Sequence, residues 1–455
     1  MLANRSIEQL PAEYLPQRST RKRSCPYLTT HRHLLHQDRA PCRRLTDPPP
    51  KRATCMKAAL DDTGTFADTA ADPLAAARAI APLLRDEAPK IETLGQLTPP
   101  VVDALHARGL YRLLLPRHLH GYGIGIEAFV KVMEALAAVD ASTAWCVGQG
   151  NGCSMAAGYV EPAVAREIWG DDPRGVLAWG FQVEGRAKVV TGGYLVNGKW
   201  AFGSGGHHAT WMGGHCHVEL PDGSLLTDCD GKPIERTMLF RQDQLTWSST
   251  WDVVGLRGSG SDTYTVTNLF VPEPYTVRRD VPEERRIDDA FYQFSTTSAY
   301  SCGFAGVSMG IARGMLDALK LLAQTKKPSH TERMLRDSPV MHHLIAENEA
   351  VLRSARAFVL EAIRDGEDCI RRNGTLDLES KVMMRLASTT AIQRAKQVAE
   401  FAYHEAGATA IFASSTFERK MRDIHASTQQ VQGRTGHIES CGQYFLGLNP
   451  TARFI

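Results

Sequence analysis

The sequence lacks the features that mark several classes of protein. No apolar run reaches the 18 residues that suggest a membrane-spanning helix, so we expect no membrane span. No two of the ten cysteines are spaced Cys-x-x-Cys, which favours a reduced, cytoplasmic protein with buried thiols over a disulfide framework or a zinc site. The 455 residues are 43% hydrophobic and 22% charged with a net charge of +2, which predicts a globular chain of two or three domains without an internal repeat.

The first 55 residues differ from the rest in charge. They contain eleven Lys or Arg and four Asp or Glu, a net charge of +7, whereas the remainder has 41 basic and 46 acidic residues, a net charge of −5. Three consecutive prolines, Pro48 to Pro50, and the lack of any helical or strand period predict that residues 1–70 form a disordered extension. A nucleic-acid arm, a membrane arm and a transit peptide are alternatives, but we prefer Met56 as the true start and expect neither nucleic acid nor membrane as a partner.

Changes in periodicity divide the remaining chain into three regions. Residues 71–175 have a helical pattern, and residues 176–280 alternate with a period of two between turn signals such as Asn197-Gly198. Residues 290–455 are helical again. We therefore predict an α+β protein, mainly α, in which a helical domain, a central β-domain shaped as a small barrel and a C-terminal helical domain follow one another.

The stretch 199–214 has the composition of a binding loop between two strands. Its residues 203–206, Gly-Ser-Gly-Gly, are too rich in glycine for a core, and they present Ser204 at their centre. Phe202 and Trp211 bracket this hydroxyl in the sequence. A hydroxyl and bare backbone N–H groups between aromatic side chains suit a planar heteroaromatic cofactor.

This stretch resembles the flavin-contacting strand pair of the acyl-CoA dehydrogenase fold, and most closely that of its flavin-dependent monooxygenase branch. The pattern Trp-x-Phe-x-Ser-Gly-x-x-His-x-x-Trp, which begins at Trp200, carries the resemblance. The run Gly-Leu-Arg-Gly-Ser at 255–259 and the segment 405–423, which ends in Arg-Asp, agree with the family in the same order. The resemblance covers about residues 72–447 and implies a helical domain, a β-barrel domain and a C-terminal four-helix bundle.

The branch consists of the oxygenase components of two-component aromatic hydroxylases. The resemblance implies that reduced FMN or FAD and O2 hydroxylate a small aromatic or heteroaromatic substrate through a flavin C4a-hydroperoxide, which must be held dry and hydrogen-bonded. It also implies a separate flavin reductase as a partner and a homotetramer with dihedral symmetry. The sequence shows no nicotinamide-binding fingerprint, which agrees with electron delivery by a partner.

The family pattern assigns cofactor contacts to individual residues. Ser204 matches the position beside flavin N5 and is the predicted catalytic hydroxyl. Further contacts to the flavin are expected from four residues, namely Phe202, Gly205, Trp211 and Arg257. For Arg257 the resemblance implies pairing with an anion of flavin or substrate, while a surface ion pair is the alternative.

The sequence does not identify the general base directly, because Gln430 occupies the position at which the family has its base histidine. A glutamine cannot take up a proton at neutral pH. His425 and His208 are the candidate substitutes as catalytic residues. The alternatives are that His425 is a polar residue on a helix face and that His208 is a barrel histidine satisfied by the backbone.

The small-residue stretch 148–158 supplies candidates for a substrate pocket. Gln149 and Asn151 fall in it, and a buried amide needs partners that either a ligand or the protein itself can provide. A pocket wall and close helix packing are therefore both open. We predict a substrate pocket formed by Trp145, Gln149, Asn151 and Gln430.

Competing functions depend on groups that the chain lacks. An acyl-CoA dehydrogenase needs a carboxylate above the flavin, but no acid lies between Asp423 and Glu439 or between Asp289 and Asp317. An acyl-CoA dehydrogenase-type oxidoreductase or oxidase without the usual glutamate is the alternative function, and a binding homologue without catalysis is another. The histidine-rich run 207–217 suggests a metal, but no carboxylate or second cluster completes a ligand set, so we predict none.

Overall fold

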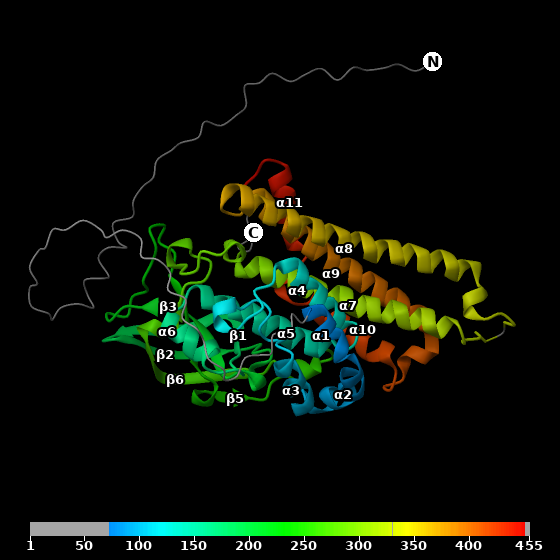
Figure 1. Ribbon diagram of the computed structural model, residues 1–455, viewed down its shortest axis with the longest axis horizontal. Coiled ribbons are helices and arrows are strands. Elements are labelled where there is room, and N and C mark those ends of the chain that lie inside the picture. The colour runs from blue at the N-terminus through cyan, green and yellow to red at the C-terminus, as the bar shows by residue number, and fades with distance from the viewer. Residues whose placement is uncertain (1–71, 330, 451–455) are drawn as a thin grey trace, which may run out of the picture. The chain divides into compact units, whose positions relative to one another are not determined.

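The computed structural model describes residues 72–329 and 331–450 (Figure 1). The predicted disordered extension of residues 1–70 and the start at Met56 therefore lie outside the described residues. In the loop 227–232, Asp228 accepts the N–H groups of Asp230 and Lys232 at 2.9 Å each. None of the described helices has the length and apolarity needed to span a bilayer.

Helices precede the sheet in the first region, as the helical pattern predicts. Their bounds are α1 Pro73–Ala79, α2 Ala81–Leu94, α3 Pro99–Ala107, α4 Ile126–Ala137, α5 Ala141–Ser154 and α6 Pro162–Ala165. Asp140 begins α5 by accepting the N–H of Thr143 at 2.8 Å, which satisfies one of the free donors of the first turn. Every residue of α5 is buried, because the helix contacts β1 of the sheet as well as α4 and α7.

The central region forms one seven-stranded sheet in the order β5-β6-β2-β1-β3-β4-β7. The strands are β1 Leu177–Val190, β2 Gly193–Trp200, β3 Trp211–Glu219, β4 Glu235–Arg241, β5 Thr246–Ser248, β6 Thr263–Pro272 and β7 Thr276–Val277. β1 and β3 pair in parallel, and the other neighbours are antiparallel.

The sheet is open, which corrects the prediction of a closed barrel. Closure would require pairing between the edge strands, but β5 has three residues, β7 has two, and the two strands are not neighbours. Such short edges offer few unpaired backbone groups, so the sheet does not need closure to protect them. The result is a mainly helical protein with a single open sheet.

Trp200 at the end of β2 anchors the loop that follows it. Its indole is fully buried, donates to the backbone carbonyl of His215 at 2.9 Å and stacks on Tyr264 with ring centroids 5.4 Å apart. A Cβ at Gly198 or Gly214 would lie 2.4 or 2.6 Å from this indole, so these two strand positions require glycine. The end of β2 is therefore fixed against β3 at the point where the 203–206 loop begins.

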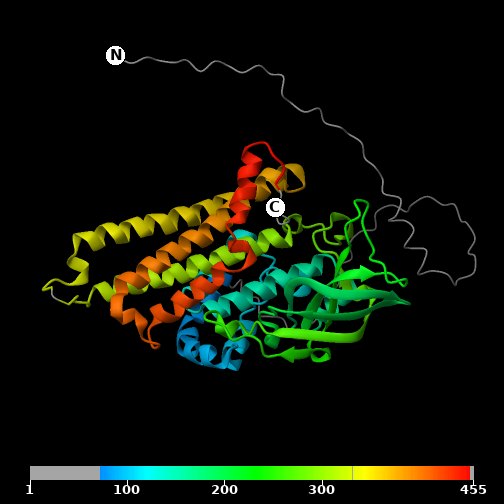
Figure 2. The same ribbon diagram turned by 180° about the vertical axis from the view of Figure 1, so that it is seen from behind.

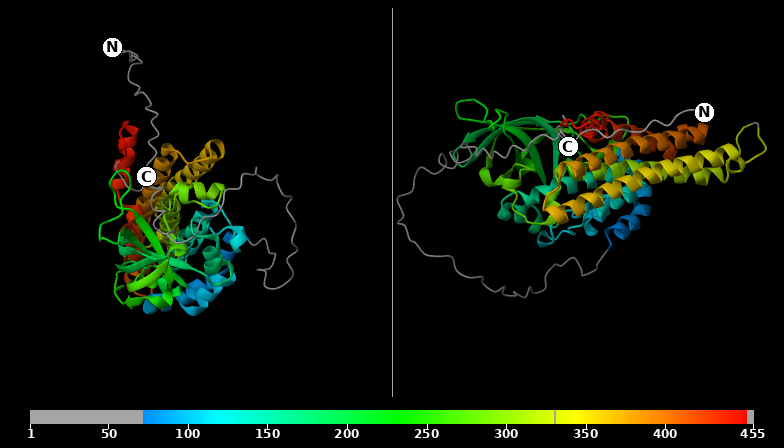
Figure 3. Two further views of the ribbon diagram at one scale, coloured as in Figure 1. Left: turned by 90° about the vertical axis from the view of Figure 1, so that its left-hand side faces the viewer. Right: turned by 90° about the horizontal axis from the view of Figure 1, so that it is seen from above.

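The last region contains α7 Thr296–Ala323, α8 Pro339–Asn373, α9 Leu378–Ala406, α10 Thr416–Thr428 and α11 Gly436–Phe445. The three longest, α7 to α9, run alongside one another, as Figures 2 and 3 show from other directions, and α10 packs on α7 and α9. Glycines on α7 allow α4 to pack closely against it. A Cβ at Gly306 would lie 2.8 Å from the backbone carbonyl oxygen of Val130, and a Cβ at Gly310 would lie 2.5 Å from that of Glu134. α5 contacts both α7 and β1, so the helices and the sheet meet beside it.

Candidate functional site

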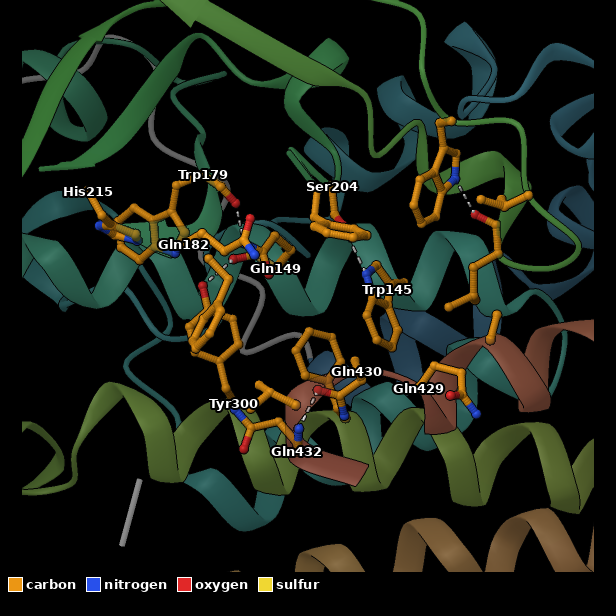
Figure 4. A pocket seen from close by; sticks show the side chains of 18 of the residues that line it. Trp145, Gln149, Trp179, Gln182, Ser204, His215, Tyr300, Gln429, Gln430 and Gln432 are labelled. Atoms are coloured by element: carbon orange, nitrogen blue, oxygen red, sulfur yellow. Dashed lines mark hydrogen bonds between the residues drawn. The ribbon is translucent and has the colours of Figure 1, made fainter. Parts of the chain in front are cut away.

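A cavity of about 1460 Å³ lies where the sheet, α5, α7 and the end of α10 meet (Figure 4). The sheet contributes residues of β1, β3 and β4, and α5 contributes Trp145 and Gln149. From α7 come Tyr300 and Phe304, and the segment 429–432 after α10 adds three glutamines and a valine. The wall thus combines aromatic side chains with many polar and charged ones, so it can hold a flat ring as well as groups that form hydrogen bonds.

Ser204 stands in this wall with its hydroxyl held from two sides. Its Oγ lies 3.2 Å from Trp145 Nε1 and 2.6 Å from Ser261 Oγ, and Ser261 Oγ is in turn 2.7 Å from Ser259 Oγ. The indole N–H can only donate, so Ser204 accepts from Trp145. When Ser261 also donates to it, the hydrogen of Ser204 is left for a group bound in the cavity.

The glycines of the 203–206 loop serve packing within the protein. Gly205 has a φ of +70° and donates its N–H to the Ser259 carbonyl at 2.9 Å, and a Cβ at Gly206 would lie 2.5 Å from Trp247. Trp211 is buried and stacks on Tyr275, with ring centroids 5.7 Å apart. Neither Gly205 nor Trp211 lines the cavity. Of the two aromatic residues expected around the hydroxyl, the structure brings only Phe202 to the cavity.

The two candidate amides on α5 have different surroundings. Gln149 lines the cavity and donates to the Trp179 carbonyl at 3.0 Å, one helical turn after Trp145, whose ring stacks on Phe304 at 4.1 Å between centroids. Asn151 does not line the cavity. Trp145 and Gln149 therefore reach the predicted pocket together, as residues four apart on one helix face do.

Asn151 belongs to the helix packing that was the alternative interpretation. Its Oδ1 accepts from the N–H groups of Leu113 and Leu114 at 2.8 and 3.2 Å, and its Nδ2 donates to the carbonyls of Leu110 and Val147 at 2.8 and 2.9 Å. All four hydrogen-bonding positions of this fully buried amide are used within the protein.

Neither candidate base histidine lines the cavity. His208 Nε2 accepts the N–H of Leu97 at 3.1 Å, and burial, with smaller contributions from His207 and His106, lowers the pKa of His208 to about 4. His425 lies on α10 with its Nε2 3.3 Å from a carboxylate oxygen of Glu400 and its side chain 38% exposed. Both positions agree with the structural alternatives named for these residues.

Gln430 does lie in the wall. Its Oε1 accepts the N–H of Gln432 at 2.8 Å, while its buried Nε2 has no hydrogen-bond partner among the described residues. A buried donor without a partner is uncommon and is satisfied when a bound group supplies an acceptor.

Arg257 has features of both roles predicted for it, namely a contact to an anion in the cavity and a surface ion pair. It lines the cavity, and its Nε lies 3.8 Å from a carboxylate oxygen of Glu92. Its Nη1 also donates to the Val253 carbonyl at 3.2 Å. The side chain is 41% exposed, so the ion pair is partly screened by solvent.

Two groups of residues, one buried behind the cavity wall and one in it, were missed by reasoning from the sequence. Ser259 and Ser261 carry the hydroxyl chain to Ser204, and the alternating Gly and Ser of the run 258–261 was the available signal. The second group, with Trp179, His215 and Arg279, lies at another part of the wall. Trp179 and Arg279 have no local sequence signal, and His215 stood out only as part of the histidine-rich run 207–217.

Comparisons with known proteins show which family this chain belongs to. Residues 302–432 match the family model described as acyl-CoA dehydrogenase, C-terminal domain. The flavin-dependent monooxygenase oxygenase subunit HsaA of Rhodococcus jostii is 25% identical over 76% of this chain and 91% of its own. Indole-3-acetate monooxygenase of Pseudomonas putida is 30% identical over 78% of this chain and 88% of its own. The chain belongs to the flavin-dependent monooxygenases of the acyl-CoA dehydrogenase superfamily.

Solved structures of other monooxygenases and hydroxylases have the same fold as this monooxygenase. XiaF from a Streptomyces species, in complex with FADH2 and glycerol, superposes with a TM-score of 0.78 at 21% identity and covers 84% of this chain and 97% of its own. The 3-HSA hydroxylase of Rhodococcus sp. RHA1 gives 0.78 at 23% identity, over 85% of this chain and 100% of its own. The acyl-CoA dehydrogenase-like fold implied by the resemblance is thereby confirmed.

The residues of the cavity fit a reduced flavin, FMN or FAD, as the cofactor of this monooxygenase. Aromatic side chains in the wall suit a flat ring system, and Ser204 supplies a hydroxyl to its polar edge. Ser204, Phe202 and Arg257 are the described residues that would hold it, and the unpartnered Gln430 Nε2 is left for the substrate.

Proposed function

We propose that this monooxygenase inserts one atom of O2 into a small aromatic or heteroaromatic substrate held in the 1460 Å³ cavity. The names of its relatives support this substrate class. They include indole-3-acetate monooxygenase, an FADH2-dependent resorcinol hydroxylase of a Rhizobium species and a p-hydroxyphenylacetate 3-hydroxylase of Acinetobacter baumannii. The last two are oxygenase components, which supports delivery of reduced flavin by a separate reductase.

The observation that carries the proposal is the position of the Ser204 hydroxyl in the cavity wall. Bound reduced flavin supplies the electrons that activate O2. Ser204 is 7% exposed and is held by Trp145 and Ser261, so its hydroxyl would donate a hydrogen bond to the polar edge of a bound flavin ring, as the family pattern implies for this position. Because both bonds to Ser204 come from the protein, the hydroxyl is oriented before any ligand arrives.

The aromatic residues beside Ser204 exclude water from the reacting groups. Trp145 stacks on Phe304, and Phe304 stacks on Tyr300 at 5.7 Å between ring centroids. Together with Gln149 and Gln430 they form the substrate side of the cavity. A dry wall favours transfer of oxygen to the substrate over release of H2O2.

We assign no general base to His425 or His208. Neither lines the cavity, and His208 already accepts a backbone N–H. Gln430 has no proton to exchange at neutral pH. The substrate therefore meets hydrogen-bond donors rather than an acid–base pair in this part of the wall.

The proposal extends to architecture and assembly. We infer that the helical, β and helical regions act as three domains, that the last is a four-helix bundle, and that four copies assemble as a homotetramer. Exposed apolar side chains in and after α11, Phe445 at 57%, Leu446 at 80% and Leu448 at 58%, support burial by another copy. Light scattering at micromolar concentration should give the mass of a tetramer, and a monomeric mass would contradict this part.

Anaerobic titration with reduced FMN and FAD, followed by mixing with O2 and a panel of aromatic compounds, tests the function. Binding of reduced flavin and oxygenated product are the expected results. Flavin reduction by an acyl-CoA would instead support the dehydrogenase-type alternative, and no binding of either flavin would support a homologue without catalysis.

A further inference from the structure

At the part of the cavity wall formed by β1, β3 and the residues after β7 lies a cation without a counterion. Arg279 lines the cavity, and it forms no ion pair with any carboxylate of residues 72–329 and 331–450. Among the other arginines of the wall, Arg236 donates to both carboxylate oxygens of Glu284 at 3.2 and 3.0 Å, and Arg422 pairs with Glu418. Arg257 lies 3.8 Å from Glu92, and Arg434 is exposed to solvent, which screens its charge. A partly buried charge without a partner is costly, and an incoming anion recovers that cost.

The sheet register builds the surroundings of this guanidinium. His215 on β3 and Thr237 on β4 are direct cross-strand partners, and Thr237 pairs with Val277 on β7, two residues before Arg279. The Arg279 guanidinium carbon lies 4.6 Å from the centroid of the Trp179 ring, and its Nη2 lies 3.4 Å from His215 Nε2. An aromatic face and a ring nitrogen therefore orient the guanidinium.

The neighbours of Arg279 do not neutralise it. A guanidinium only donates hydrogen bonds, so in the 3.4 Å contact His215 Nε2 is the acceptor. The Nδ1 of His215 lies 2.8 Å from Thr237 Oγ1, and an imidazole in any form carries no negative charge. The carboxylate of Asp280, which also lines the cavity, accepts from Thr296 N at 2.7 Å at the start of α7 and is not within ion-pair distance of Arg279. The positive charge of Arg279 is left for a ligand.

Arg279 is connected to the Ser204 part of the wall through Trp179. Gln149, on the same face of α5 as Trp145, donates to the Trp179 carbonyl, and Trp145 donates to Ser204. In Figure 4, His215 and Trp179 lie to one side, Ser204 lies away from them, and Gln149 and Gln182 lie between. A ligand that places a ring beside Ser204 and extends past Gln149 brings its far end to Arg279.

We propose that Arg279 is the anion-recognition residue of the cavity and that the substrate is an aromatic acid, with its ring towards Ser204 and its carboxylate on the guanidinium. This inference rests on the proposed function and specifies its substrate class. A planar carboxylate matches the fork of an arginine in a bidentate pair. A phosphate monoester carries nearly two charges at neutral pH, and this position offers one unpaired cation, which favours the carboxylate over the phosphate of a flavin.

Calorimetric titration of the flavin-free full chain with matched acids and amides tests the proposal. The probes are indole-3-acetate with indole-3-acetamide and 4-hydroxyphenylacetate with 4-hydroxyphenylacetamide, because each amide keeps the shape and loses the charge. The wild type should bind at least one acid about 10- to 100-fold more tightly than its amide. Arg279→Gln should abolish that preference while amide affinity stays within about twofold, which also shows that the variant folds.

Two further variants distinguish recognition of the carboxylate by Arg279 from a nonspecific effect of positive charge near the cavity. Arg279→Lys keeps the charge without the planar fork and should recover part of the preference for the acid. Arg278→Gln, which removes the adjacent cation paired with Glu284 outside the cavity wall, should leave both affinities unchanged. An equal loss of acid affinity in Arg278→Gln would overturn the proposal, as would an absence of acid preference in the wild type.

Flavin binding distinguishes the failure of this inference from the failure of the function. If Arg279→Gln weakens the binding of FMN but not of riboflavin, Arg279 contacts the flavin phosphate and the proposal is overturned while the monooxygenase function stands. If neither flavin binds the wild type, the proposed function fails, and the acid preference of the flavin-free chain still decides the role of Arg279.

Discussion

Trp145 donates its indole N–H to the Oγ of Ser204, and this 3.2 Å bond joins the buried helix α5 to the loop after β2. The two residues are 59 positions apart in the sequence, and both line the cavity. The bond uses a lone pair of Ser204 and leaves its hydrogen available, so the helix sets how the hydroxyl points.

Trp145→Phe tests this orientation without emptying the wall. Phenylalanine keeps the stacking on Phe304 but loses the donor, so Ser204 is held only by Ser261. We expect flavin affinity within about threefold of the wild type, since one neutral hydrogen bond contributes about 1 kcal/mol or less. The fraction of consumed O2 released as H2O2 should rise by several fold. Unchanged coupling would show that the Trp145 bond does not orient Ser204.

Asn151→Ala tests the assignment of this residue to packing. The substitution leaves two N–H groups and two carbonyls without their partner inside the protein. The free energy of unfolding in urea should fall by about 3 kcal/mol, since buried groups lose their hydrogen bonds. Asn373→Ala, at an exposed site at the end of α8, is the matched control and should cost less than about 1 kcal/mol. A normal stability with impaired ligand binding would restore the pocket-wall interpretation of Asn151.

His208 predicts a specific loss of stability in acid. Its pKa in the folded protein, about 4, lies below its ordinary value of 6.5, so between these values the unfolded chain binds the additional proton. The contribution of His208 to stability is therefore complete above pH 6.5, falls as the pH drops towards 4, and amounts to at most about 3 kcal/mol.

His208→Gln should flatten this pH dependence, because glutamine can accept the Leu97 N–H without titrating. The measurement is the free energy of unfolding between pH 4 and 6.5, with His404→Gln, whose side chain is 87% exposed, as the control. An identical slope in the wild type and in His208→Gln would mean that His208 is not held neutral. Residual slope is expected from His106, whose pKa burial also lowers to about 4.

The sequence identifies the elements of this fold whose signals are local. The helical pattern of residues 71–175 and the alternation of 176–280 correspond to helices and strands, and the family pattern placed Ser204, Phe202 and Gln430 at one cavity. The closed barrel was wrong because closure depends on the lengths of β5 and β7, which no local signal reveals.

The sequence alone does not predict which residues the register of the sheet brings together. His215 and Thr237 become neighbours only through the pairing of β3 with β4, and Arg279 joins them through β7. The glycine loop shows the same limit, because what excludes a side chain at Gly206 is Trp247, a residue 41 positions later. Composition indicates that a close approach occurs there, and the tertiary structure decides which group approaches.

The central claim is that the Ser204 hydroxyl acts on the reaction at the flavin and contributes little to binding. The most direct measurement compares Ser204→Ala with the wild type and with Ser224→Ala, whose hydroxyl bonds to Asp222 in an exposed loop. It records the affinity for reduced flavin, the O2 consumed, the H2O2 released and the hydroxylated product in one series. We predict a change in flavin affinity on the order of 1 kcal/mol, continued O2 consumption, raised H2O2 and a product yield lowered at least tenfold, with Ser224→Ala unchanged. Wild-type coupling in Ser204→Ala would contradict the account.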